Sequence, residues 1–212
     1  MKTLPVFAIS RHRMITDGAG VTALVAAMGC PLKCRYCINA EALEKAEYTT
    51  DKKAKWKITD LTPEELYDRV KIDDLYFRAT NGGVCFGGGE SLLHSEFIED
   101  FSRLVDGRWK ITVETSLNIS TEIFRRVLPF VDEFIVDIKD MNSDIYREYT
   151  GLDNSNVINN LRILADFTET KKIRIRIPRI PNYNTDDDIK SSAEILEKFG
   201  FSDFDIFDYI LK

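Results

Sequence analysis

The sequence predicts an α/β fold, a partial (β/α)6 barrel formed by one domain that spans residues 1–212. Short apolar or β-branched runs recur along the chain, and helix-start signals stand between them. No linker, internal repeat or low-complexity stretch interrupts this alternation. Strands that alternate with helices pair in parallel, because each helix carries the chain back across the sheet.

Six strands are expected. The first is the continuous apolar run VTALVAAM, which is typical of a parallel strand buried on both faces. The fifth alternates isoleucine with arginine, as expected for a strand with one buried face. The stretch 38–60 is polar, and the charge run DKKAKWK within it (51–57) is expected to be a solvated loop. The expected strands are 21–28, 84–86, 110–114, 133–138, 172–177 and 205–210.

Helices are expected between these strands. Thr62 and Pro63 are a cap followed by a proline at the first helical position, and Ser120 is a second cap. Three aspartates stand at the start of the last helix, where the helix dipole favours acids. The expected helices are 62–72, 95–106, 121–130, 142–150, 155–166 and 185–199.

Composition excludes several classes of protein. Lys and Arg total 29 against 35 Asp and Glu, and the net charge of −6 repels phosphate backbones, so no nucleic-acid partner is expected. No run of 18 apolar residues exists, so no membrane span is expected. The N-terminus lacks the features of a signal peptide, which makes the cytoplasm the expected location and keeps the four cysteines reduced.

Three cysteines lie within eight residues, in the motif GCPLKCRYC. Cys30, Cys34 and Cys37 have the spacing C-x3-C-x2-C. A structural zinc takes four ligands, and neither of the two histidines stands at finger spacing from this cluster. A redox C-x2-C pair would leave Cys30 unused. The spacing therefore favours an iron–sulfur cluster over zinc, and either of these over three inert cysteines.

C-x3-C-x-aromatic-C, with Tyr36 as the aromatic residue, resembles the cluster motif of the radical S-adenosylmethionine enzymes. The resemblance implies that Cys30, Cys34 and Cys37 hold a [4Fe–4S] cluster and that Tyr36 lies at the cofactor. It implies that S-adenosylmethionine binds the open iron through its amino and carboxylate groups. One electron from flavodoxin or ferredoxin then yields a 5′-deoxyadenosyl radical that abstracts hydrogen from a substrate. The partial barrel is the usual core of this superfamily.

The other candidate residues end successive strands, and in such barrels the chemistry sits at the carboxyl ends. The glycine run GGGE ends the second strand, and the resemblance implies that Gly88, Gly89 and Glu90 bind the amino group and methionine part of the cofactor. Glu114 ends the third strand and precedes Thr115 and Ser116. In the family such an acid lies by the cofactor's ribose or a monovalent cation, and Ser116 is expected at the cofactor too.

Asp137 and Lys139 end the fourth strand and point the same way, which by itself predicts only an ion pair. The resemblance places Lys139 at the cofactor's carboxylate and Asp137 in the active site. Arg176, five residues before Pro181, matches a family arginine in the fifth strand. We expect these three side chains to be catalytic and cofactor-binding.

Three further stretches resemble the glycyl-radical-enzyme activating enzymes. They are DGAGVT (17–22), VDIKDMNSDIYREYTGLDN (136–154) and IRIRIPRIPNYNTDDD (173–188), so the resemblance spans about residues 15–210. It implies that a partner glycyl radical enzyme is the substrate. Ala19, Thr22 and Asn182 depart from the family's Pro, Arg and Gly. The chain ends at Lys212 without the activases' last helix, so a wide lateral opening is expected.

These departures keep a second hypothesis open, a stand-alone radical enzyme that modifies a small molecule or peptide. A third is a non-catalytic zinc-binding module. Cys85 is expected to be a small buried residue, and one spare cysteine supplies no ligand set for an auxiliary cluster. The run from Arg11 to Arg13 is expected to be solvent-facing charge, with contact to an anionic substrate as the alternative.

Overall fold

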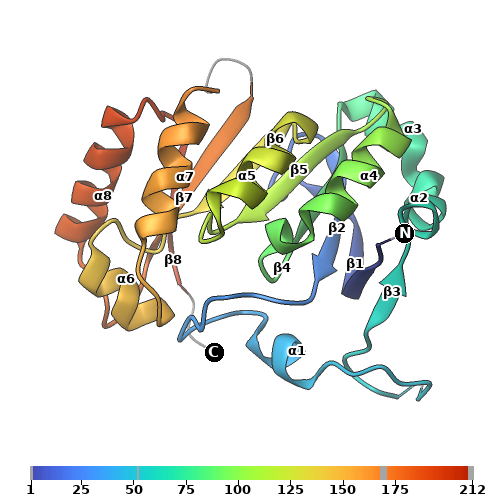
Figure 1. Cartoon of the computed structure of the whole chain (residues 1–212), viewed down its shortest axis with the longest axis horizontal. Coiled ribbons are helices and arrows are strands. Elements are labelled where there is room, and N and C mark those ends of the chain that lie inside the picture. The colour runs from blue at the N-terminus through green and yellow to red at the C-terminus, as the bar shows by residue number, and fades with distance from the viewer. Residues whose placement is uncertain (1, 52, 168–170, 210–212) are drawn as a thin grey trace.

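A computed structural model describes residues 2–51, 53–167 and 171–209 of the chain (Figure 1). Its strands form one eight-stranded sheet in the order β3-β1-β2-β4-β5-β6-β7-β8. Six of them run parallel in sequence order and confirm the six expected strands. Residue 210, the last of the expected sixth strand, lies outside the described residues. The parallel strands are β2 (Val21–Ala27), β4 (Gly83–Gly88), β5 (Lys110–Thr115), β6 (Glu133–Asp137), β7 (Lys172–Arg179) and β8 (Phe204–Asp208).

Two strands were not predicted. β1 (Leu4–Met14) pairs antiparallel with β2, and β3 (Thr59–Leu61) pairs antiparallel with β1. The first carries a proline and ends in charged residues, so its alternation is obscured. The second has three residues, and its partner is more than fifty residues away in sequence. The charge run 51–57 lies outside the helices and strands where it is described, whereas the polar stretch before it contains a helix that was not predicted, α1 (Ala40–Lys45).

The six expected helices are all present. Their starts follow the expected side chains, since Thr62 accepts from Glu65 N and Ser120 accepts from Ile123 N. A further helix, α3 (Asp74–Thr80), was not predicted. The expected ones are α2 (Pro63–Val70), α4 (Ser95–Val105), α5 (Thr121–Val127), α6 (Ser143–Thr150), α7 (Ser155–Ala165) and α8 (Asp186–Lys198). Among the described residues no helix is long and apolar enough to cross a membrane.

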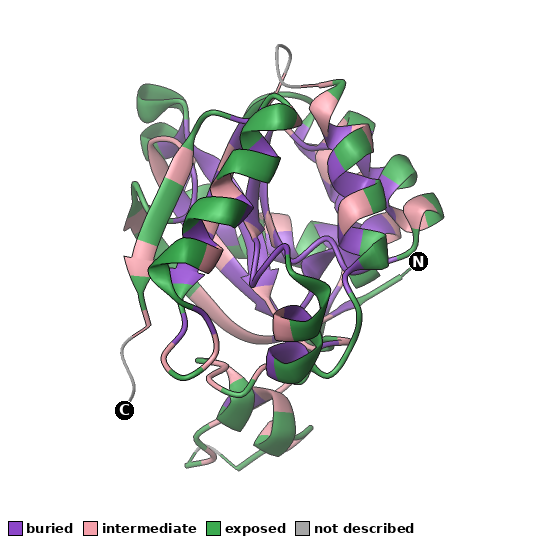
Figure 2. Ribbon diagram, turned by 90° about the vertical axis from the view of Figure 1, so that its left-hand side faces the viewer, coloured by how far each residue is buried: buried purple, intermediate pink, exposed green. Residues whose placement is uncertain are grey.

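The two faces of the sheet differ in chemistry. Helices α4, α5 and α7 lie along one face (Figure 1), and the strands beneath them are buried (Figure 2). Phe86 points to this face and packs edge-on against Phe97 and Phe101, with ring centroids 6.2 and 5.5 Å away. Because successive strand residues face opposite sides, the alternate positions point into the barrel. Those positions include Cys85, Thr112, Glu114, Glu133, Asp137 and Arg176. The helices thus take the apolar set, and the charged set is left for the interior.

The turn before β2 crosses the amino end of the barrel. Ala19 N donates to Glu133 Oε2 at 2.9 Å, and Arg174 Nη1 donates to the Ile15 carbonyl at 3.2 Å. Asp17 is buried there and accepts from Arg13. The DGAGVT stretch therefore helps close the end of the barrel opposite the cysteine motif.

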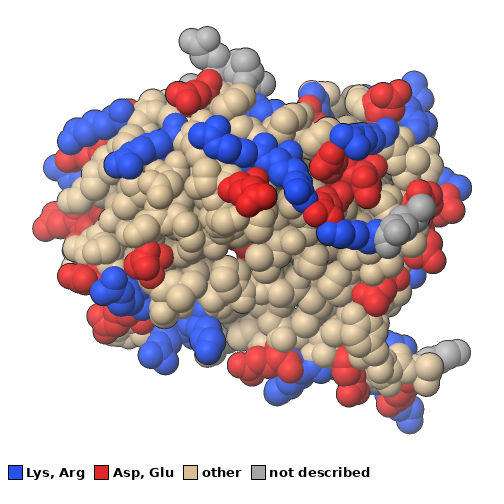
Figure 3. All heavy atoms as spheres, viewed as in Figure 1, with Lys and Arg blue, Asp and Glu red and all other residues tan. Residues whose placement is uncertain are grey.

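The basic run at residues 11–13 lies at this same end. Arg11 and His12 are exposed, and both contact the buried carboxylate of Asp73 at distances of 2.5 to 2.9 Å. A register shift in β1 between Ser10 and Arg13 turns both side chains towards it. The run is therefore paired charge at the end of the barrel opposite the cysteines. Figure 3 shows Lys, Arg, Asp and Glu intermingled on the face that carries the helices.

Candidate active site

The cysteine loop follows β2 and docks on the end of helix α6. Lys33 N donates to the Thr150 carbonyl at 2.8 Å, and Arg35 N donates to the Tyr149 carbonyl at 3.2 Å. The last carbonyls of a helix have no partner within the helix, so they are available to accept from another segment. The two bonds flank Cys34 and fix its place in the loop.

The three thiols of the cysteine loop are close enough to influence one another electrostatically. Cys30 is exposed, whereas Cys34 and Cys37 are half-buried. Although the residue is exposed, the protein around the Cys30 thiol partly shields it from water and raises its pKa to about 11. The neighbouring thiols at Cys34 and Cys37 act in the same direction, so the three groups lie within electrostatic range. Among the described residues no three His, Cys, Asp or Glu side chains converge on the position of one metal ion. Thiolates are the ligands that iron–sulfur clusters take, so the donor set of the loop fits such a cluster by its chemistry.

The glycine run supports the cysteine loop from below. Glu90 N donates to the Gly29 carbonyl at 2.7 Å, and Gly89 N donates to the Ala27 carbonyl at 2.9 Å. A Cβ atom at Gly89 would lie 2.0 Å from the Gly29 oxygen. Gly88 has a φ of +93°, a conformation that favours glycine. The run therefore brings two backbones together more closely than any side chain would permit.

Asn39 ties the two segments together and was not singled out from the sequence. Its Nδ2 donates to the Gly88 carbonyl at 2.7 Å. A polar residue two positions after Cys37 was the only signal for it. The bond fixes the exit of the cysteine loop against the end of β4.

Glu90 joins the ends of two strands. Its carboxylate accepts from Thr115 Oγ1 at 2.6 Å and from the backbone and hydroxyl of Ser116 at 2.9 and 2.7 Å. It also accepts from Leu92 N at 3.3 Å. Burial raises the pKa of Glu90, and these hydrogen bonds lower it in part. With both oxygens bonded and the side chain 1% exposed, the carboxylate holds the ends of β4 and β5 in register.

Charged residues from three neighbouring strands meet at the rim, as the sequence led us to expect. Arg176 Nη1 donates to Glu114 Oε1 at 2.9 Å, and Arg176 Nε donates to Asp137 Oδ1 at 2.6 Å. Lys139 Nζ lies 3.4 Å from Asp137 Oδ2. Two cations thus face two anions, which offsets the cost of taking each charge out of water.

The environment sets the charge of each group in this row. Burial opposes ionisation of Asp137, but the charges of Lys139 and Arg176 lower its pKa. Burial raises the pKa of Glu114 to about 7 despite the attraction of Arg176. Burial also raises the pKa of Cys34, whereas the Lys139 ammonium lowers it. The last effect shows that the cysteine loop lies within electrostatic reach of the charged row.

Four tyrosines lie between the cysteine loop and this row. The ring of Tyr149 lies 6.1 Å from Tyr36, 5.1 Å from Tyr183 and 6.3 Å from Tyr209, measured between centroids. Tyr36 and Tyr183 are 5.8 Å apart. Only Tyr36 was identified from the sequence, because the other three come from α6, the turn after β7 and the end of β8.

One departure from the family pattern, Asn182 in place of glycine, has a structural explanation. Asn182 has a φ of +68°, in the left-handed region that glycine adopts freely and that asparagine tolerates. Its Nδ2 donates to Tyr36 Oη at 3.4 Å. The substitution therefore keeps the backbone turn and adds a contact to the cysteine motif.

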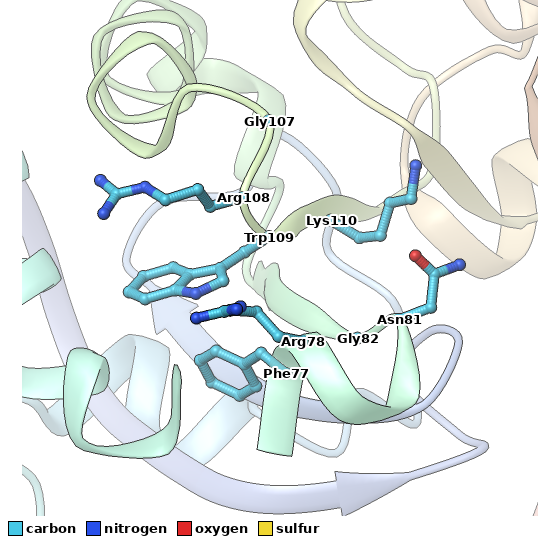
Figure 4. Close-up of a pocket in the computed structure, with 8 residues that line it drawn as sticks. All are labelled: Phe77, Arg78, Asn81, Gly82, Gly107, Arg108, Trp109 and Lys110. Carbon is cyan, nitrogen blue, oxygen red and sulfur yellow. The ribbon is translucent and has the colours of Figure 1, made fainter. Parts of the chain in front are cut away.

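A pocket of about 250 Å³ lies elsewhere, at the amino ends of β4 and β5 (Figure 4). Arg78 and Lys110 line it beside Phe77 and Trp109. These two cations are paired with Asp74 and Asp132. The pocket is separate from the rim that carries the cysteine loop.

Comparisons with known proteins agree with this geometry. A family model described as the Radical SAM superfamily matches residues 24–196. The (2S)-3-sulfopropanediol dehydratase activating enzyme of Klebsiella oxytoca is 28% identical, over 92% of this chain and 78% of that protein. The pyruvate formate-lyase-activating enzyme of Staphylococcus aureus is 27% identical, over 91% of this chain and 76% of that protein.

Solved structures show the same fold. SuiB of Streptococcus suis superposes with a TM-score of 0.60 at 14% identity, over 87% of this chain and 38% of the SuiB chain. QueE of Escherichia coli superposes with a TM-score of 0.52 at 13% identity, over 96% of this chain and 93% of QueE. At these identities the likeness concerns the fold alone.

Gly89→Ala tests the close approach of the glycine run. We expect a loss of about 1–3 kcal/mol in unfolding free energy, because the new Cβ would displace the Gly29 carbonyl. We also expect faster alkylation of the loop thiols. Gly107→Ala is the control, since its Cβ would meet no atom within 4 Å although its φ is +70°. Equal thiol reactivity in the two variants would contradict the proposed contact.

Substitutions at Asn182 test the left-handed turn. Asn182→Gly should cost less than Asn182→Ala by about 1 kcal/mol, because only alanine is strained at a φ of +68°. Urea unfolding of both variants measures the difference. An alanine variant as stable as the glycine variant would show that the turn does not have this conformation.

The raised pKa of Glu114 predicts a pH-dependent stability. An acid with a raised pKa stabilises the fold fully below its ordinary value of 4.5, and this contribution is lost as the pH rises through about 7. Between about pH 5 and 8 we expect the wild type to lose about 1–3 kcal/mol of unfolding free energy that Glu114→Gln retains. The control is Glu122→Gln, an exposed site. Parallel profiles for the wild type and Glu114→Gln would refute the prediction.

Proposed function

Because this chain belongs to the radical SAM superfamily, we propose that Cys30, Cys34 and Cys37 hold a [4Fe–4S] cluster at which S-adenosylmethionine is cleaved. The observation that carries the proposal is the cysteine loop docked on α6 and the glycine run, within electrostatic reach of Lys139. The bound cluster would supply one electron that converts S-adenosylmethionine to methionine and a 5′-deoxyadenosyl radical able to abstract a hydrogen atom.

The rim residues would bind and orient the cofactor. Gly88 and Gly89 let the end of β4 pack directly on the cysteine loop, so that their backbone would lie beside the amino group of the cofactor, and Glu90 keeps Ser116 in place next to them. Lys139, whose ammonium stays charged next to Asp137, would receive the cofactor's carboxylate.

The charged row would face the ribose and the reacting carbon. Glu114 uses Oε1 for Arg176, which leaves Oε2 for a ribose hydroxyl or a monovalent cation. Arg176 fixes Glu114 and Asp137 relative to each other, so the two carboxylates present one rigid edge. Tyr36 would flank the cofactor from the cysteine loop.

We propose that the substrate is a glycyl radical enzyme, with flavodoxin or ferredoxin as the electron donor. Support for the substrate comes from relatives that are 27–28% identical and are themselves activating enzymes. A stand-alone enzyme that acts on a small molecule or peptide is the second candidate, and it rests on Thr22 and Asn182. A zinc-binding module is disfavoured because a structural zinc takes four ligands and no histidine stands at finger spacing from the three cysteines.

Production of 5′-deoxyadenosine tests the proposed chemistry. Anaerobically reconstituted protein with dithionite and S-adenosylmethionine should form it, and Cys34→Ala should reduce its formation at least a hundredfold. The control is Cys85→Ala, because Cys85 is buried inside the barrel, away from the loop. Equal product from the Cys34→Ala and Cys85→Ala variants would refute the assignment of the ligands.

A glycyl radical signal tests the partner. The protein should generate that paramagnetic signal in a glycyl radical enzyme encoded near its own gene. If it forms 5′-deoxyadenosine but generates no such signal in any glycyl radical enzyme of its source, the second candidate is favoured.

A further inference from the structure

The Lys139 ammonium is buried, yet its bonds to protein groups are long. It is 8% exposed, and its neighbours are Asp137 Oδ2 at 3.4 Å and Tyr209 Oη at 3.3 Å. An ammonium has three protons to donate, and buried donors are normally bonded at shorter distances. Lys139 therefore retains capacity for an additional acceptor.

Tyr149 is a second buried donor at the same place. The residue is 1% exposed, and among the described residues its Oη has no hydrogen-bond partner. A buried hydroxyl without a partner costs free energy, so its position calls for an acceptor that the protein itself does not provide. The ring is held by Tyr36, Tyr183 and Tyr209, and its own carbonyl accepts from Arg35 N. The hydroxyl is thus fixed in place before any ligand arrives.

Tyr209 links these two donors. Its Oη accepts from Lys139 Nζ, and its ring lies 5.9 Å from that nitrogen. The phenolic proton of Tyr209 remains available because the bond uses only its oxygen. Burial raises the pKa of Tyr149, the neighbouring Tyr209 raises it further, and Lys139 lowers it only in part, so this hydroxyl also stays protonated. Lys139, Tyr149 and Tyr209 therefore present one ammonium and two hydroxyl donors.

This donor set fits a carboxylate. A carboxylate has two oxygens and about four acceptor sites, so it can accept from several donors at once. One oxygen of Asp137 already lies near the Lys139 ammonium, but its other oxygen accepts from Arg176. When Glu114 is ionised, the four charges of Glu114, Asp137, Lys139 and Arg176 sum to zero, so neutral hydroxyls supply the additional stabilisation that a further anion needs.

We propose that Tyr149 and Tyr209 complete, with Lys139, a binding site for the methionine carboxylate of S-adenosylmethionine. The inference rests on the proposed function and extends it to two tyrosines outside the cysteine motif. In this role Tyr149 determines specificity, because its hydroxyl stabilises a bound ligand that carries a carboxylate. It is held at the site by the same end of α6 that anchors the cysteine loop.

A comparison of two ligands tests the inference by binding alone. Dissociation constants are measured anaerobically, without reductant, on reconstituted protein for S-adenosylmethionine and for its decarboxylated analogue. Tyr149→Phe should weaken binding of S-adenosylmethionine about tenfold or more and change binding of the analogue less than twofold. Tyr209→Phe should show the same pattern. Tyr183→Phe, which alters a ring of the same cluster, should change neither constant.

The outcomes separate the inference from the proposed function. If S-adenosylmethionine binds and Tyr149→Phe weakens both ligands equally, or neither, the carboxylate site is refuted and the proposed function stands. If the wild type binds no S-adenosylmethionine, the proposed function fails and the inference fails with it. Unfolding of Tyr149→Phe by urea provides a second measurement. It should match the wild type, because the substitution removes a hydroxyl that has no partner.

Discussion

The close contact between the cysteine loop and the glycine run is the constraint on which the site depends. Glu90 N and Gly29 O are bonded at 2.7 Å, and no Cβ fits at Gly89. On the other side the same loop donates to the last carbonyls of α6. Three cysteines separated by flexible chain would have no defined relation to the barrel. Held between β4 and α6, they stand directly over the strand ends.

The charged row depends on the alternation of the strands. Glu114, Asp137 and Arg176 occupy interior positions on β5, β6 and β7, while their neighbours in sequence pack under the helices. One buried charge among them would destabilise the fold, but two cations facing two anions tolerate burial. The row thereby combines stability of the barrel with a polar, preorganised surface. Such a surface positions a cofactor without large rearrangement.

Much of the fold and site followed from the sequence because both rest on local patterns. Apolar runs and helix caps located six strands and six helices, and parallel topology placed the strand-end residues on one rim. Strand β1 escaped because its proline and charged end obscure the alternation, and β3 escaped because it has three residues and a partner more than fifty residues away. The hydrogen bonds that Glu90 accepts from Thr115 and Ser116 also depend on the register of two strands.

The tyrosines show most clearly which part of the site the sequence could not predict. Tyr149, Tyr183 and Tyr209 are far apart in sequence, and each lies in a stretch with no catalytic pattern. Their contact arises only when α6, the turn after β7 and the end of β8 meet at the cysteine loop. Asn182 is similar, since its left-handed backbone and its bond to Tyr36 become evident only in three dimensions.

The paramagnetic resonance spectrum of the reduced protein, recorded before and after addition of S-adenosylmethionine, tests the central claim most directly. A four-iron cluster held by Cys30, Cys34 and Cys37 keeps one iron open, so the account predicts a reduced-cluster signal whose g-values change when S-adenosylmethionine binds. A protein that takes up one zinc per chain, or a cluster whose spectrum does not respond to S-adenosylmethionine, would contradict it.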